Sequence, residues 1–216
     1  TATELDKNTA IGYQALKVAS GSAGTGENTA VGYLAGTAMT SGYQNTIMGA
    51  YAGDSINTGF RNTTIGYAAG AALTSGAYNT AIGMYALQTQ GGSASSTAVG
   101  YSCLNVANGA NNSGFGSEAL KELSSGANNT AVGYRAGRYY GDSTSGLTTA
   151  NQCIYIGELS RGNANSMTNE IVIGYNAEGR GGSNSVTIGN SSVTLWAPGA
   201  DDTVSLGNAS YRFADV

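Results

Sequence analysis

Carboxylates are the only side chains in this 216-residue sequence that could carry acid–base catalysis, because the chain contains no histidine. Glycan hydrolysis needs two carboxyl groups about 5 to 10 Å apart. The 13 acidic residues are dispersed, and the one adjacent pair is Asp201 and Asp202. We interpret this pair as a solvated turn, or at most a weak calcium ligand. Without histidine, Ser-His-Asp and Cys-His catalysis and histidine metal sites are excluded. The sequence therefore predicts no enzyme activity, no cofactor and no metal.

A second candidate site is the segment 138–151, where tyrosines stand beside charged and amide side chains. Aromatic rings can stack on sugars, and the polar groups beside them can hydrogen-bond sugar hydroxyls. The candidate ligand-binding residues are Arg138, Tyr139, Tyr140, Asp142 and Asn151. The alternative is that this segment only connects two parts of the molecule.

The composition excludes nucleic-acid binding and membrane insertion. Only nine Lys and Arg residues are present, they are scattered, and the net charge is −4, so there is no basic surface for a phosphate backbone. No apolar run approaches the roughly 18 residues that a membrane helix needs. The start, Thr1-Ala2-Thr3, has no signal-peptide pattern, and we interpret it as an internal fragment or a processed product.

The elements that must position these residues belong to a repeat, Asn-Thr-small-aliphatic-Gly. Its closing glycines are 20, 17, 17, 17, 17, 16 and 17 residues apart. After each glycine comes a second block, usually an aromatic, any residue, a small residue and then Leu or Gly, followed by a polar turn. The eight copies of the first block are 8–12, 28–32, 45–49, 62–66, 79–83, 96–100, 112–116 and 129–133.

This spacing predicts an all-β fold, a parallel β-solenoid or β-roll with one repeat of about 17 residues per coil. Stacking coils at about 4.8 Å pairs each backbone segment with the coils above and below, and twelve coils make a rod of roughly 58 Å. The asparagines that open the repeats then form a structural ladder. Its members are Asn8, Asn28, Asn45, Asn62, Asn79, Asn112 and Asn129.

The two faces of each strand differ in side-chain size. Side chains alternate along a strand, so Thr9 and Ile11 share one face, and Asn8, Ala10 and Gly12 share the other. We expect the Thr and Ile/Val face to fill the interior of the coil. The alanine and glycine face then packs against sister subunits in an intertwined or closely packed homotrimer. The alternative is that small residues fit a tight corner of the coil. Because threonine shares the face expected to be buried, the sequence argues against an ice-binding surface.

Three regions follow from the pattern. Residues 1–137 form the repeat solenoid, 138–153 an irregular loop, and 154–216 looser β repeats with a C-terminal β-prism-like cap. Four further strands are expected at 154–157, 171–174, 186–189 and 204–207, and Trp196 and Pro198 lie in the cap.

Cys103 and Cys153 are expected to be buried free thiols. They stand three coils apart, about 14 Å along the rod, which is beyond the roughly 7 Å limit for bridged Cα atoms.

The repeats, for example Asn79-Thr80-Ala81-Ile82-Gly83, resemble those of bacteriophage tail-fibre and tailspike proteins. They are also similar to the heads of trimeric autotransporter adhesins. The ending 204–216, from Val204-Ser205-Leu206-Gly207 to Asp215-Val216, resembles the segment just upstream of an endosialidase-type intramolecular chaperone in phage fibres. That chaperone itself is absent.

This resemblance implies an extracellular, non-enzymatic homotrimer in the distal shaft of a virion tail fibre. Its expected partners are a host cell-surface glycan or protein receptor and other tail-fibre segments. Two alternatives stay open at this point: the head of a bacterial trimeric autotransporter-type adhesin, and a fragment of a tailspike depolymerase.

Overall fold

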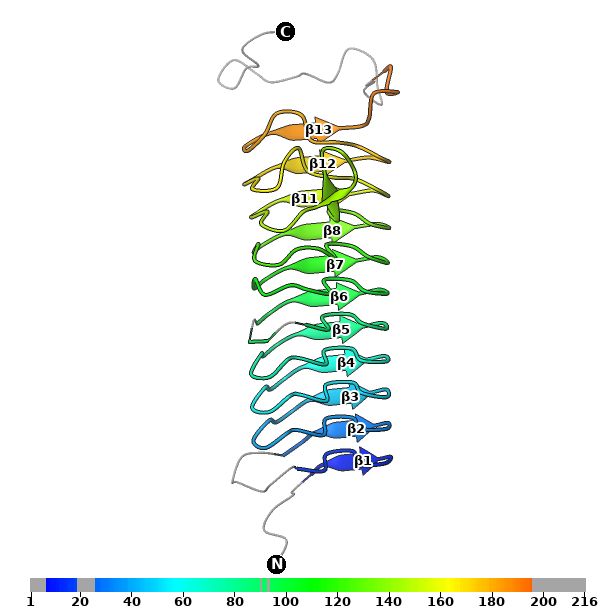
Figure 1. Ribbon diagram of the computed structural model, residues 1–216, viewed down its shortest axis with the longest axis vertical. Helices are drawn as coiled ribbons and strands as arrows, with labels where there is room; N and C mark the ends of the chain where they lie inside the picture. Colours follow the sequence, from blue (N-terminus) through cyan, green and yellow to red (C-terminus); the bar gives the residue numbers. More distant parts are fainter. Residues whose placement is uncertain (1–6, 19–25, 90, 93, 196–216) are drawn as a thin grey trace, which may run out of the picture.

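The computed structural model describes residues 7–18, 26–89, 91–92 and 94–195. Eleven three-residue strands form one sheet in the order β1-β2-β3-β4-β5-β6-β7-β8-β11-β12-β13, stacked along a rod (Figure 1). They are β1 Thr9–Ile11, β2 Thr29–Val31, β3 Thr46–Met48, β4 Thr63–Ile65, β5 Thr80–Ile82, β6 Thr97–Val99, β7 Ser113–Phe115, β8 Thr130–Val132, β11 Ile154–Ile156, β12 Ile171–Ile173 and β13 Val186–Ile188. The predicted all-β parallel solenoid is confirmed.

Every pair of neighbouring strands is parallel and in register with the repeat. Thr29 pairs with Thr46 and Val31 with Met48, so equivalent residues form columns along the rod. Backbone bonds also join successive coils at the ends of the strands, as from Thr29 N to Asn45 O at 2.8 Å and from Gly32 N to Ile11 O at 2.8 Å. Each coil therefore contacts only the coils above and below it.

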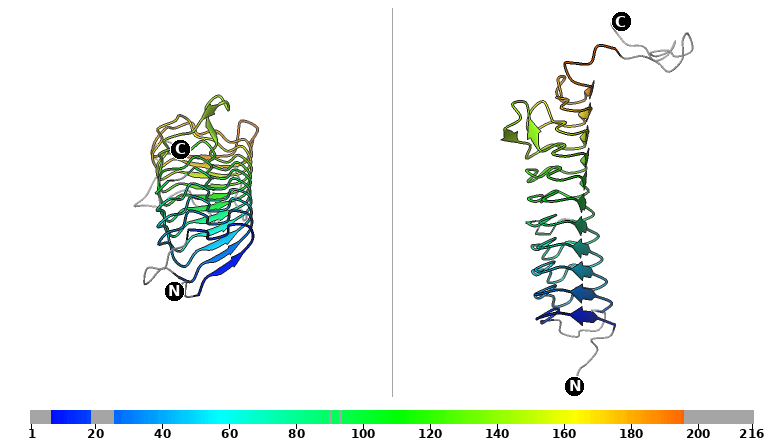
Figure 2. Two further views of the ribbon diagram at one scale, coloured as in Figure 1. Left: turned by 60° about the horizontal axis from the view of Figure 1, so that its bottom comes forward. Right: turned by 90° about the vertical axis from the view of Figure 1, so that its right-hand side faces the viewer.

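A short antiparallel hairpin is inserted in the chain between β8 and β11, which pair directly with each other. Its strands are β9 Tyr139–Tyr140 and β10 Ser145–Gly146. It projects from the side of the rod opposite the sheet, as the right-hand view in Figure 2 shows. The predicted irregular loop 138–153 thus contains its own β structure.

The interior of the coil is lined by strand centres, most of them small but including Ile47, Tyr155 and Val172, and by larger residues from the turns. Ala30, Ala81 and Ala98 at the strand centres are fully buried, and so are Leu87 and Leu120 from the turns. One layer of leucine, isoleucine or methionine fills the space that the alanines leave.

The expected orientation of the strand faces was therefore wrong. The Thr and Ile/Val face points outward, and Ile11 and Ile82 are exposed. The alanine face is covered by the chain's own turns and not by sister subunits. The alternative, that small residues fit a tight coil, describes the structure.

The asparagine column forms a buried hydrogen-bonded ladder from Asn28 to Asn79, and it resumes at Asn112 and Asn129 after Ser96. Asn45 donates from its backbone N (2.9 Å) and its Nδ2 (3.0 Å) to Asn28 Oδ1, and Asn62 makes the same two bonds to Asn45 Oδ1 at 3.0 and 3.1 Å. Nδ2 of Asn62 also donates to the carbonyl of Gly76 at 2.8 Å. Each amide thus ties its own coil to the coil below and fixes the turn that leads to the next strand.

The glycine after each strand is required by the close approach of the coils. Gly49 has φ +133°, and a Cβ placed there would lie 2.5 Å from the carbonyl oxygen of Gly66 in the next coil. Any larger residue would overlap with backbone that the sheet holds in place.

The region after 153 continues the same solenoid as far as it is described. β11, β12 and β13 belong to the same sheet as β8 and keep its register. The fourth expected strand (204–207), the acidic pair, and Trp196 and Pro198 of the predicted cap lie outside the described residues.

Candidate interaction surfaces

The residues that end the strands form an extended apolar surface along the described part of the rod. These residues stand one above the other at the coil spacing, and many are exposed, from 36 % at Ile82 to 60 % at Ile11. This aliphatic column comprises Ile11, Val31, Met48, Ile65, Ile82, Val99, Phe115, Val132, Ile156, Ile173 and Ile188.

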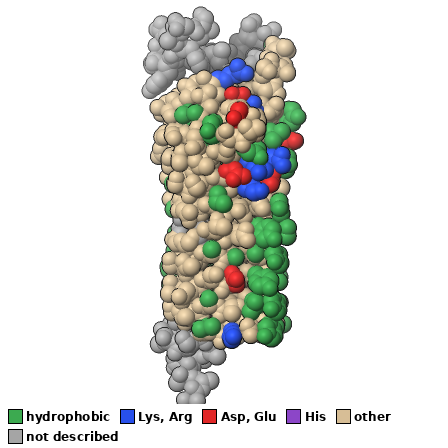
Figure 3. Space-filling model, in the orientation of Figure 1, with side chains coloured by type: hydrophobic (Ala, Val, Ile, Leu, Met, Phe, Trp, Pro, Cys, Tyr) green, Lys and Arg blue, Asp and Glu red, His purple; other side chains and the backbone are tan. Residues whose placement is uncertain are grey.

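An aromatic column follows the corner just past the strands. Tyr13 and Tyr33 stack with ring centroids 5.3 Å apart. Edge-to-face contacts then link Tyr33, Tyr51, Tyr67, Tyr85 and Tyr101 in turn at 5.3 to 6.3 Å. Hydrophobic side chains gather in a column along one margin of the molecule in Figure 3. We call the aliphatic and aromatic columns together the outer stripe.

We number the coils along the rod, so that coils 1 to 8 carry β1 to β8 and coils 9, 10 and 11 carry β11, β12 and β13. The aromatic column is interrupted in coils 7 and 9, where Ser117 and Glu158 stand in place of tyrosine. Tyr134 and Tyr175 continue the column above these positions and are exposed. Sequence analysis found both columns but assigned the aliphatic one to the interior. The signal that could have corrected it is the leucine of the second block, which supplies the large core residue.

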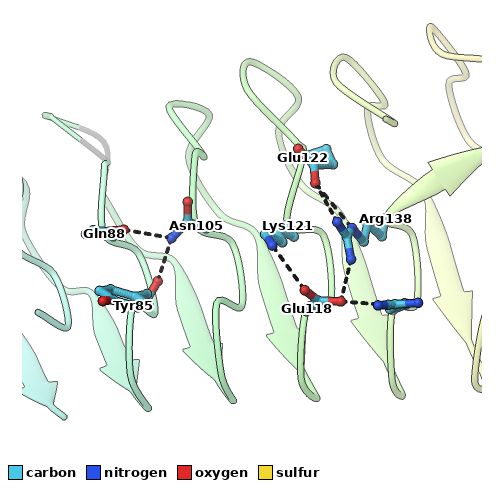
Figure 4. A network of polar contacts seen from close by, with 8 residues as sticks. Tyr85, Gln88, Asn105, Glu118, Lys121, Glu122 and Arg138 are labelled. Atoms are coloured by element: carbon cyan, nitrogen blue, oxygen red, sulfur yellow. Dashed lines mark hydrogen bonds and ion pairs between the residues drawn. The ribbon is translucent and has the colours of Figure 1, made fainter. Parts of the chain in front are cut away.

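Charged side chains gather beside the hairpin (Figure 4). Glu118 is buried and accepts from Arg135 Nε at 2.6 Å and Lys121 Nζ at 3.0 Å. It also pairs with Arg138, whose Nη2 lies 3.1 Å from Glu122 Oε1. Burial opposes ionisation of Glu118, but the bonds from Arg135 and Lys121 outweigh it and lower the pKa. The network fixes the base of the hairpin to coils 7 and 8.

Most polar groups of the predicted ligand-binding segment form hydrogen bonds or ion pairs with other residues of the chain. Arg138 lies between two glutamates, with its guanidinium 4.6 Å from the centroid of the Tyr139 ring. Asn151 Oδ1 accepts from Ala127 N at 3.1 Å, and its Nδ2 donates to Thr149 O at 2.8 Å. Tyr139 and Tyr140 are half-buried in β9. Binding of a ligand by these residues stays a prediction.

Asp142 closes the hairpin turn. Its Oδ1 accepts from Ser145 N at 2.8 Å and Thr144 N at 2.9 Å, and its Oδ2 from Ser145 Oγ at 3.0 Å. These bonds, first of all the one from the Ser145 backbone, hold the pKa of the carboxyl well below its usual range. Asp142 thus stabilises the turn of the hairpin.

A buried acid that sequence analysis missed lies at the ladder position of coil 10. Glu170 is fully buried, its Oε1 accepts from Asn163 N at 3.1 Å, and its Oε2 accepts from the Tyr155 hydroxyl at 3.3 Å. Burial raises its pKa more than these bonds lower it. Its position in the asparagine column was the available signal.

The remaining chemical candidates have structural roles or lie outside the described part. Cys103 and Cys153 are free and buried, as predicted, and burial raises the pKa of the Cys103 thiol to about 12. Within the described residues, no three His, Cys, Asp or Glu side chains cluster as metal ligands would. The same part of the chain contains no helix with the length and hydropathy to cross a membrane.

Comparison with family models, with curated proteins and with solved structures finds no match to this chain.

Proposed function

We propose that the chain is a non-enzymatic shaft segment of a bacteriophage tail fibre that assembles as a homotrimer through the outer stripe and helps to hold the fibre on the host surface. The observation that carries the proposal is the exposed outer stripe. Exposed apolar surface of this extent is costly for a lone chain and marks an interaction site.

The repeat spacing supports a second copy of the same chain as the partner. The outer stripe presents one apolar rung per coil, about every 4.8 Å, over eleven coils. A partner must offer apolar groups at that spacing over the whole length, and a parallel copy of the same solenoid does so coil by coil. Three copies around one axis close the assembly and leave no stripe unpaired.

The oligomeric state in solution tests the assembly. We expect light scattering after size exclusion to give three times the 21.6 kDa chain mass. The double variant Ile82→Asp/Val132→Asp places carboxylates in the stripe and should give a monomer. Thr58→Asp, an exposed turn position outside the stripe, should remain trimeric. A monomeric wild-type chain contradicts the proposal.

The place of the chain in a virion needs a separate test. An antibody against the purified chain should label the distal part of the tail fibres in electron micrographs of the phage that encodes it. Labelling of a bacterial outer surface in uninfected cells would instead favour the trimeric adhesin head.

Ice binding is a second candidate, because the ground on which the sequence argued against it was wrong. The threonine column faces outward beside the aliphatic column, and Thr9 and Thr46 are exposed. A thermal hysteresis measurement separates the two functions. A freezing-point gap that Thr63→Lys/Thr80→Lys abolishes favours ice binding, and its absence in wild type leaves the fibre proposal.

A further inference from the structure

A polar cleft of about 160 Å³ opens between the turns of coils 9, 10 and 11, just past the aromatic column. It is lined by Arg161, Asn176, Glu178, Arg180 and the turn 190–192. The lining consists of guanidinium, amide, carboxylate and hydroxyl groups. Its size gives room for roughly ten water-sized groups, which fits a single sugar ring.

Arg161 forms a fixed floor for this cleft. Its Nη2 pairs with Glu178 Oε2 at 2.8 Å, its Nη1 donates to Asn176 Oδ1 at 2.6 Å, and its Nε donates to the hairpin carbonyl of Gly141 at 3.0 Å. The side chain is only 13 % exposed. The hairpin, coil 9 and coil 10 therefore hold the floor in one geometry before any ligand arrives.

Arg180 supplies the uncompensated charge. It is exposed, and within the described part of the chain no carboxylate forms an ion pair with it. The charge of Glu178, by contrast, is balanced by Arg161. Among the described residues the cleft thus carries one positive charge without a carboxylate partner, beside hydroxyl and amide groups that can both donate and accept.

From this arrangement we infer that the cleft binds an acidic saccharide unit. Its carboxylate pairs with Arg180, and its ring hydroxyls bond to Asn176, Glu178 and the turn 190–192. A lipid tail or an apolar ligand is disfavoured by the polar lining. A polyphosphate is disfavoured because Arg161 is already paired with Glu178, which leaves Arg180 alone to meet its several charges. The inference names a ligand class for the attachment role and rests on that proposed function for its biological meaning.

Titration of the full chain with sodium glucuronate, followed by amide chemical shifts in two-dimensional NMR, tests the site. We expect saturable shifts in 176–192 with a Kd on the order of 1 mM, as the small contact implies. Glucose, which has the hydroxyls without the carboxylate, should bind about tenfold more weakly, the factor expected for one charge-assisted contact. Sodium acetate should give no saturable shift at equal concentration.

Two variants separate the cleft from general charge effects. Arg180→Gln should reduce glucuronate binding to the level of glucose. Arg61→Gln removes an exposed arginine elsewhere on the rod and should leave binding unchanged. Three results would overturn the inference. They are equal binding of acetate and glucuronate, unchanged glucuronate binding in Arg180→Gln, and an equal loss of glucuronate binding in both variants.

Light scattering on the same samples distinguishes this inference from the proposed assembly. The cleft lies within one chain, so a monomer that binds glucuronate refutes the trimer and keeps the site. A trimer without saturable glucuronate binding keeps the assembly and refutes the site.

Discussion

At the scale of single residues, the asparagine ladder makes a graded prediction. Asn62 is fully engaged, since its amide bonds to coils on both sides and to Gly76 O. Asn62→Ala removes the acceptor of Asn79 N and the donor to Gly76 O in the interior, and should cost about 2 to 6 kcal/mol of unfolding free energy, because each buried unsatisfied group costs ~1 to 3 kcal/mol.

The chain itself offers the control for this variant. Ser96 occupies the same column, and its Oγ accepts from Asn112 N at 3.3 Å. Asn62→Ser should therefore retain the bond to the next coil and cost less than Asn62→Ala. Denaturant unfolding of the three proteins checks the order, and equal losses would mean that the ladder contributes little.

Glu170 makes the folded state sensitive to pH. Its folded-state pKa is raised by burial, so the native chain holds a proton that the unfolded chain releases above about pH 4.3. The contribution of Glu170 to the unfolding free energy is fully present below that pH. It falls as pH rises through the folded-state pKa, by at most about 1.4 kcal/mol per pH unit.

The variant Glu170→Gln should remove this dependence. It keeps the shape of the side chain without its charge, so it should match wild type near pH 4 and be more stable near pH 7. Glu158→Gln alters an exposed acid and should leave the slope unchanged. Urea unfolding between pH 4 and 8 measures all three, and identical slopes for wild type and Glu170→Gln contradict the prediction.

At the scale of the elements, sequence reasoning placed the strands and their shared faces but not the inner face. The period of the repeat locates each strand, and alternation puts Thr80 and Ile82 on one side. Hydrophobicity then favours burying the larger side chain. In this coil the turn residue Leu87 already fills the interior, so only Ala81 fits beside it and Ile82 is left outside. Which face of the strand is buried depends on the width of the coil interior, and this width cannot be read from the sequence of one repeat.

The hairpin could not be predicted because it lies outside the repeat, and one side chain, Asp142, closes its turn. Asp142→Ala removes three accepted bonds from the turn and should open the hairpin without unfolding the rod. Chymotrypsin should then cut faster after Tyr139 or Tyr140, while the melting temperature changes little. Asp142→Asn keeps the acceptor oxygen and should restore resistance.

This hairpin also has a pH dependence of known sign. The pKa of Asp142 is lowered by its hydrogen bonds in the folded state. The stability that ionised Asp142 gives to the hairpin is therefore present above about pH 3.9, the ordinary pKa of an aspartate. It is lost as pH falls through the folded-state pKa. Protease resistance of the wild-type hairpin should persist into mild acid, and its loss near neutral pH would contradict this assignment.

At the scale of the whole molecule, the periodicity dictates a rod, whereas the number of chains around it depends on surfaces that only the fold reveals. The sequence placed the interface on the alanine face. In the described part of the chain the outer stripe is an apolar surface open to a partner, with Ile11, Tyr13 and Tyr175 all more than half exposed. The aliphatic side chains that were expected inside the coil thus belong to the surface proposed for association.

The rod should unfold from its ends and at one internal weak point. Each coil contacts only its neighbours, so stability is a sum of local terms along the axis. The weak point is β6–β7, where Ser96 replaces the ladder asparagine and Gly114 replaces the central alanine. Hydrogen exchange followed by mass spectrometry on the full chain should show the slowest exchange at β3–β5 and β8, faster exchange at β6–β7, and the fastest at β1 and β13. Ser96→Asn should slow exchange in β6 and β7 specifically. Uniform protection from β1 to β13, unchanged by Ser96→Asn, would show that the rod unfolds as a single unit and that the ladder does not set its local stability.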